Sequence, residues 1–105
     1  MSNQQPIDAP DAADRVKQAE QLFRKKQIPQ AATLLENVLG AEPEHEQALY
    51  LLAVCRRVQR RFDDALKLLE RLRMQAPDYA RAWQEIGHNH RDLGRFESAI
   101  DAYEN

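Results

Sequence analysis

The chain has 105 residues, a length that limits it to one domain at most. Its 15 basic and 17 acidic residues are interspersed and give a net charge of -2, which does not favour binding to nucleic acid or to an anionic membrane. A single cysteine excludes an internal disulfide framework, and without a signal peptide or an apolar membrane-spanning run the sequence predicts a cytoplasmic protein.

The predicted elements are all helices. Residues 1–10 are polar and contain two prolines, so we expect a disordered N-terminal arm there. From residue 11 onward, apolar residues recur at helical spacing, and no segment alternates with the period of a strand. Pro29 suits the first turn of a helix, whereas Gly40 and Gly94 suit C-terminal caps. The expected helices span about residues 11–26, 29–40, 44–59, 62–75, 78–93, and 96 to the end.

Related residues return along the chain at a constant interval. Ala31, Ala65 and Ala99, for example, lie 34 residues apart. A fixed period of this length is the mark of stacked structural repeats. The other residues that keep the interval are Leu35, Leu69 and Tyr103; Ile28, Phe62 and Phe96; Ala19, Ala53 and Gly87; and Pro43 with Pro77.

The third unit, AWQEIGHNHRDLGRFESAIDAY, resembles the tetratricopeptide repeat. The resemblance covers about residues 11–105 and implies stacked antiparallel helix pairs that form a right-handed α-solenoid. The implied units are about 12–45, 46–79 and 80–105, the last of them incomplete. The residues that match the family signature are Trp83, Ile86, Gly87, Gly94, Phe96, Ala99 and Tyr103.

The recurrent residues have packing roles in this scheme. Small residues let paired helices approach closely, and Phe62 and Phe96 are expected to fill the corner beneath each turn. Arg15 and Gln18 stand where the family has large apolar residues. The first helix is therefore predicted to be an N-terminal cap whose outer side faces water.

The resemblance also implies a binding surface, because this family binds ligands in the concave groove lined by the first helix of each pair. Apolar contacts in the N-terminal half, with Arg57, Arg81 and Arg91 as an anion-recognition end, suit an extended or helical peptide that carries an acidic element. An ordinary solvated face fits the same residues equally well. The expected groove residues are Val16, Glu20, Phe23, Arg24, Gln47, Tyr50, Val54, Arg57, Arg81, Gln84, His88 and Arg91.

The sequence predicts no catalytic centre, cofactor or metal site. His88 and His90 lie two apart on a helix and so point to different sides, the first toward the groove and the second partly packed. Cys55 has no partner at metal-ligand spacing and is interpreted as a buried, inert thiol. Family members that hold the C-terminal carboxylate of chaperones use a set of basic and amide side chains, of which only Arg81 has a match here, so the sequence argues against a clamp for chaperone tails.

Two functions of different class follow from the resemblance. The first is a protein-interaction scaffold, one module of a larger protein. The alternative is the substrate-presenting module of a longer enzyme, because YARAWQEIGHNHRDLGRFESAI resembles repeats that precede bacterial sulfotransferase domains. In either case Ile100 and Tyr103 in the last helix are expected to lack cover, which predicts weak self-association through that helix.

Overall fold

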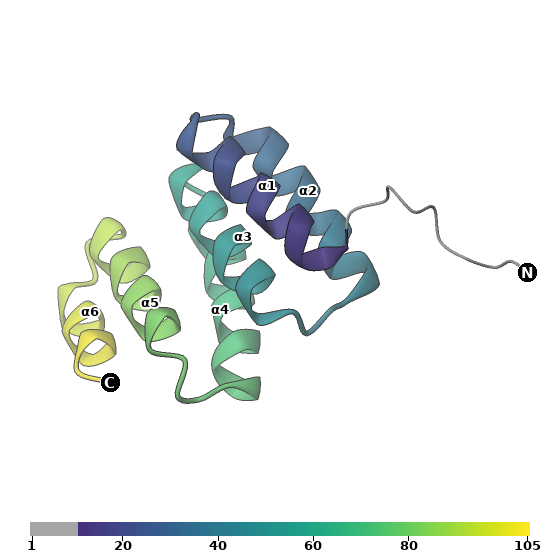
Figure 1. Cartoon of the computed structure of the whole chain (residues 1–105). Coiled ribbons are helices and arrows are strands. Elements are labelled where there is room, and N and C mark those ends of the chain that lie inside the picture. The colour runs from purple at the N-terminus through teal and green to yellow at the C-terminus, as the bar shows by residue number, and fades with distance from the viewer. Residues whose placement is uncertain (1–10) are drawn as a thin grey trace, which may run out of the picture.

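The computed structural model describes residues 11–105, which form six α-helices in antiparallel pairs (Figure 1). No strand occurs in these residues, so the all-α prediction is confirmed. The predicted disordered arm lies outside the described residues. The helices are α1 (Ala12–Arg24), α2 (Ile28–Ala41), α3 (Glu46–Val58), α4 (Phe62–Gln75), α5 (Ala80–Asp92) and α6 (Phe96–Tyr103).

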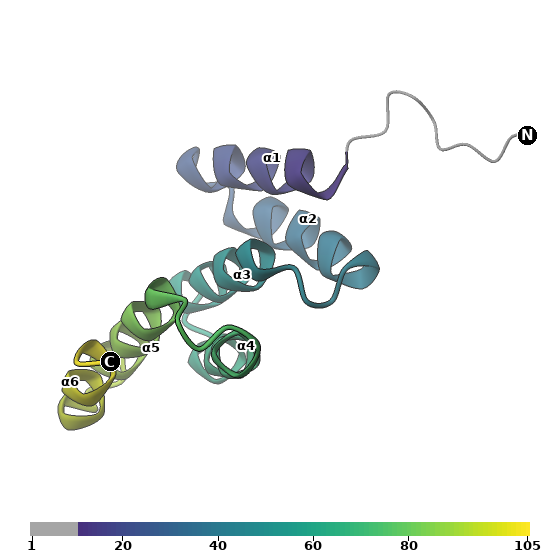
Figure 2. The same cartoon turned by 60° about the horizontal axis from the view of Figure 1, so that its bottom comes forward.

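The three helix pairs stack in chain order. Each helix packs against the next one along the chain, and α3 also contacts both α1 and α5 (Figure 2). The first helices of the pairs therefore lie in one row, with α3 in the middle. None of the helices in the described part of the chain is long and apolar enough to cross a membrane.

Local signals explain where α1, α2 and α3 begin. The side chains of Asp11 and His45 accept hydrogen bonds from backbone N–H groups at the starts of α1 and α3. Pro29 lies in the first turn of α2, as predicted. The prediction for Gly40 is wrong, because α2 runs through it and closes with an ordinary helical bond from the Glu42 N–H to the Val38 carbonyl, 2.8 Å long.

The turn inside each pair contains one residue with a left-handed backbone. Lys26 and Arg60 have φ of 64°, and Gly94 has φ of 79°. Glycine adopts this conformation freely, whereas other residues need support from the surrounding structure. Gly94 thus ends α5 as predicted, and the three residues keep the interval of the repeat.

The recurrent small and leucine positions form the interior. Leu35 and Leu69 are fully buried, and two apolar clusters run from α1 through α3 to α5. Gly87 lies under the Tyr103 ring, where an added Cβ would come within 2.3 Å of Cε1. Close packing of the paired helices is the reason for the small residues at these positions.

The C-terminal end of the stack is less covered. Phe62 is half-buried and lines a shallow surface pocket together with Leu93, whereas Phe96 is 64% exposed. The prediction that Phe96 fills a corner is therefore wrong, because no described helix packs over it. Ile100 and Tyr103 are 54% and 43% exposed, which confirms that they lack cover.

Candidate functional site

The row formed by α1, α3 and α5 carries the predicted groove residues, and we call their accessible members the first-helix surface. Val16 does not belong to it. Its side chain is only 1% exposed and packs in the apolar cluster between α1, α2 and α3, so it cannot contact a ligand. The first-helix surface consists of Glu20, Phe23, Arg24, Gln47, Tyr50, Val54, Arg57, Arg81, Gln84, His88 and Arg91, all exposed or half-buried.

Side-chain contacts across this surface join the three helices. Gln47 Nε2 on α3 donates a 2.8 Å hydrogen bond to Glu20 Oε2 on α1. The Arg81 guanidinium on α5 lies over the Tyr50 ring on α3, 5.6 Å from its centroid. Tyr79 lies beside Tyr50, with 6.1 Å between the ring centroids. Tyr50 and Arg81 thus form an aromatic–cation pair in the middle of the surface.

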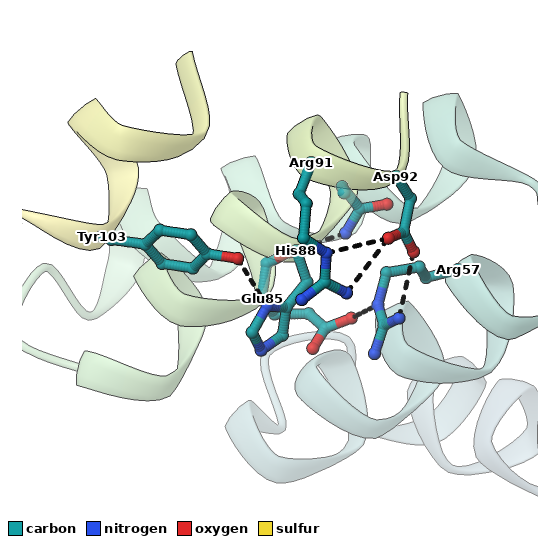
Figure 3. A network of polar contacts seen from close by, with 7 residues as sticks. Arg57, Glu85, His88, Arg91, Asp92 and Tyr103 are labelled. Carbon is teal, nitrogen blue, oxygen red and sulfur yellow. Dashed lines mark hydrogen bonds and ion pairs between the residues drawn. The ribbon is translucent and has the colours of Figure 1, made fainter. Parts of the chain in front are cut away.

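Arg57 binds acidic side chains of the protein itself (Figure 3). Its Nε donates to Glu85 Oε2, and its Nη1 donates to Asp92 Oδ2 at 3.2 Å. Glu85 is only 3% exposed, so this ion pair is largely removed from water. Arg57 therefore joins α3 to α5, which leaves its guanidinium less available to a ligand; its place in an anion-recognition end stays a prediction.

Arg91 extends the same network at the surface. Its Nη2 lies 3.0 Å from Asp92 Oδ1, and its side chain is half exposed. Arg81, by contrast, is exposed and forms no ion pair within residues 11–105. Of the three arginines predicted to recognise an anion, Arg81 is the most available and Arg91 shares its charge with Asp92.

Opposite charges keep this network ionised. Burial lowers the pKa of Arg57, but its hydrogen bonds and charge interactions with Glu85 and Asp92 outweigh burial and raise that pKa. Burial raises the pKa of the Asp92 carboxyl, yet hydrogen bonds from Arg91 and Arg57 hold it below its usual value. The charged forms of Arg57 and Asp92 are therefore favoured by their contacts with each other and with Glu85 and Arg91.

His88 links the first-helix surface to the last helix. Its Nδ1 shares a 2.8 Å hydrogen bond with the Tyr103 hydroxyl, and the two rings meet edge to face (Figure 3). Burial lowers the pKa of His88, with Glu85 opposing that shift and Arg57 adding to it. His88 is therefore neutral at physiological pH and ties α5 to α6 on the groove side.

The lowered pKa values of His88 and His90 predict that stability depends on pH. Burial is the main cause at both positions, with Arg95 adding to it at His90. Below the usual histidine pKa of 6.5 the unfolded chain takes up these protons first, so protonation favours unfolding. We expect the melting temperature to fall from about pH 7 to about pH 5.5, and the variant with His88→Gln and His90→Gln to show a weaker fall. An equally steep fall in that variant would contradict the assignment.

Sequence reasoning missed three residues of the site. Tyr79, Glu85 and Asp92 all contact predicted residues, although none of them was expected to line the groove. The 34-residue interval could have drawn attention to Glu85. The corresponding residue on α3 is Leu51, which is apolar. A carboxylate at a position that is apolar in another unit needs a nearby cation, and Arg57 supplies it.

The described residues contain no cluster of metal ligands and no exposed thiol. Within residues 11–105 no group of three His, Cys, Asp or Glu side chains could hold a metal ion. Cys55 is fully buried, as predicted, and burial raises the pKa of its thiol to about 11 despite the opposing charge of Arg56. The site is therefore a surface of fixed charges and aromatic rings.

Comparison with known proteins agrees with this architecture. A protein-family model described as tetratricopeptide repeat matches residues 22–86. A search of curated proteins finds no match to this chain.

Several solved structures share the fold. The globular C-terminal domain of LpoP from P. aeruginosa has a TM-score of 0.84 at 24% identity, covering 94% of this chain and 96% of that one. The second TPR of Spaghetti (RPAP3), bound to the HSP90 peptide SRMEEVD, has a TM-score of 0.82 at 15% identity, covering 90% and 87%. MamA has a TM-score of 0.80 at 19% identity, and the match covers 90% of this chain but 55% of MamA. These likenesses confirm the predicted solenoid of helix pairs.

Proposed function

The chain belongs to the tetratricopeptide repeat family, and we propose that it is a protein-interaction scaffold whose first-helix surface binds a peptide segment of a partner. The observation that carries the proposal is the pair of Arg81 and Tyr50 in the middle of that surface. Arg81 offers a guanidinium without a carboxylate partner in the described chain, and Tyr50 offers an aromatic face beside it. Together they suit a ligand that combines an anionic and an apolar group.

The charges of the first-helix surface predict how the bound peptide is oriented. Arg81 and Arg91 lie on α5, whereas Glu20 lies on α1 at the other end of the row. An acidic element is attracted to the arginines and repelled by Glu20, so it lies toward α5. Apolar side chains of the ligand then contact Val54 and Phe23. The peptide in the similar Spaghetti (RPAP3) structure also contains acidic residues, but of the side chains that hold chaperone tails in this family only Arg81 has a match here.

We expect a labelled peptide of alternating Leu and Glu residues to bind more tightly than the same peptide with Lys in place of Glu. Replacing Arg81 and Arg91 with Glu reverses two partly exposed charges, so we expect about a tenfold loss of affinity for the acidic peptide. Added salt weakens the wild-type complex, because exposed charges are screened. Fluorescence polarisation measures each affinity.

A matched variant controls for net charge in this experiment. Arg61→Glu with Lys67→Glu changes the net charge by the same amount at exposed positions near and on α4. We expect the control variant to keep most of the preference for the acidic peptide. Equal affinity of the wild type for both peptides, or equal losses in the two variants, would contradict the role of Arg81 and Arg91.

Weak self-association through α6 is a further part of the proposal. Ile100 and Tyr103 are accessible, but pairing of two α6 helices also brings together their carboxylates at Glu97, Asp101 and Glu104. We therefore expect dimers only at high protein concentration, and more of them as salt screens the repulsion. Sedimentation velocity across a concentration series checks this result. A strict monomer at every concentration and salt level would refute it.

A further inference from the structure

α6 lies at one end of the row of helices (Figures 1 and 2), and one side of it carries a stripe of exposed apolar side chains. Phe96, Ile100 and Tyr103 follow each other at helical spacing and are 64%, 54% and 43% exposed. Ala99 and Ala102 on the adjoining side of the helix are buried. Phe96 and Ile100 therefore lie away from the side of α6 that packs in its own unit. The Tyr103 ring, by contrast, lies over Gly87, and its hydroxyl is hydrogen-bonded to His88.

The earlier repeats show what covers this stripe. Two repeats earlier in the chain, the positions that correspond to Ile100 and Tyr103 are Ala32 and Leu35 on α2. Both are almost fully buried, in a cluster that includes Leu52 from α3. At the interface between the first and second helix pairs, which we call the first interface, these positions of α2 are therefore covered by the amphipathic helix α3.

An acidic edge runs beside the stripe. Glu97, Asp101 and Glu104 lie on one side of it, all exposed and without an ion pair in residues 11–105. On α4 the corresponding edge is interrupted by a lysine, Lys67. Its third position, Glu70, is paired with an arginine of the same helix. The continuous acidic edge is thus a particular feature of α6.

The first interface shows how such a carboxylate is used. Glu36, the counterpart of Glu104, pairs with Arg56 of the covering helix α3. Arg56 is only 9% exposed, whereas the Glu36 side chain is 53% exposed, so the pair lies at the rim of the interface between α2 and α3. The helix that covers α2 therefore places a cation against the single carboxylate on the corresponding edge of α2.

We propose that α6 binds an amphipathic helix whose apolar stripe is flanked by lysine or arginine, placed on α6 as α3 lies on α2. Phe96, Ile100 and Tyr103 contact the apolar stripe, and the acidic edge pairs with the basic flank. This site lies on α6 and touches the first-helix surface through the hydrogen bond between Tyr103 and His88.

Neither α6 nor α1 of a second copy of this chain complements the site as well as a basic amphipathic helix does. A second α6 brings carboxylates against carboxylates. The α1 helix of a second copy has Arg15 and Gln18 at the positions that correspond to Leu49 and Leu52 of α3. It therefore lacks the apolar stripe with which α3 covers α2. Charge complementarity therefore favours a basic helix over self-pairing.

The test uses two synthetic helical peptides that share a stripe of Leu residues. The basic probe has Lys along one flank of the stripe, and the acidic probe has Glu at the same positions. We expect the wild-type protein to bind the basic probe at least about tenfold more tightly, which three partly exposed charge pairs can supply. Amide chemical shifts in NMR spectra are expected to change at Ile100 and its neighbours when the basic probe is added.

Charge reversal on α6 then identifies the acidic edge. We expect the variant with Glu97→Lys, Asp101→Lys and Glu104→Lys to prefer the acidic probe. The control variant, with Glu44→Lys, Asp63→Lys and Asp78→Lys, has the same net charge and should keep the wild-type preference. All three control positions are exposed and lie outside α6.

Three results would overturn the proposal. One is equal affinity of the wild type for both probes, a measurement that needs no variant protein. Another is a chemical-shift change that avoids α6. The third is a wild-type dimer through α6 at low protein concentration, because that would make a second copy the occupant of the stripe.

Discussion

Arg57→Ala is expected to lower the free energy of unfolding by about 3 kcal/mol. The substitution removes the cation that faces Glu85, whose carboxylate is only 3% exposed and is left poorly solvated without that partner. The Arg57 side chain itself is 20% exposed, which places the expected loss at the lower end of the range for buried ion pairs. Urea unfolding followed by circular dichroism measures the change.

Two variants separate the buried charge from its surroundings. Arg91→Ala also removes a partner of Asp92, but at a half-exposed position, so we expect a loss below about 1 kcal/mol. Arg57→Met combined with Glu85→Leu removes both charges and is expected to recover most of the stability lost in Arg57→Ala. Equal losses of unfolding free energy in Arg57→Ala and Arg91→Ala would show that the buried ion pair stabilises the fold no more than the exposed one.

Leu69→Ala is expected to lower the free energy of unfolding by about 2–5 kcal/mol. Leu69 is fully buried in the cluster shared by α3, α4 and α5, and its removal leaves a cavity that the packed helices fill only in part. We expect a loss of the same size for Leu35→Ala, because Leu35 has the same role one repeat earlier.

The third residue of this series provides the control. Tyr103 occupies the same repeat position but is 43% exposed, so Tyr103→Ala is expected to cost less than either leucine substitution. Unfolding by urea, with hydrogen exchange to locate the loosened helices, measures the three variants side by side. A loss in Tyr103→Ala as large as in Leu69→Ala would contradict the conclusion that the stack is less covered at α6.

The fold could be predicted because its signals are local or periodic. Pro29 and Gly94 mark helix boundaries through backbone geometry that each residue determines by itself. The series of Ala31, Ala65 and Ala99 shows the stacking, because each repeat buries the same face against its neighbour. Gly40 misled the prediction because a glycine near a helix end is not always its cap.

The site was less predictable because its contacts join distant parts of the chain. Arg57 lies 28 residues from Glu85, and neither residue by itself indicates the other. Val16 looked accessible from its position in the first helix, but its orientation depends on how α2 and α3 pack around it. The enzyme-linked alternative stays a prediction, because it concerns a domain beyond these repeats.

The most direct test of the proposed function is to map a bound acidic peptide by NMR. Titration of the labelled protein with the peptide of alternating Leu and Glu residues is expected to shift amide signals along α1, α3 and α5. The largest changes are expected near Tyr50 and Arg81, where the aromatic ring and the guanidinium lie together. Shifts confined to α2 and α4, or no shifts at a peptide concentration that saturates the polarisation assay, would contradict a binding role for the first-helix surface.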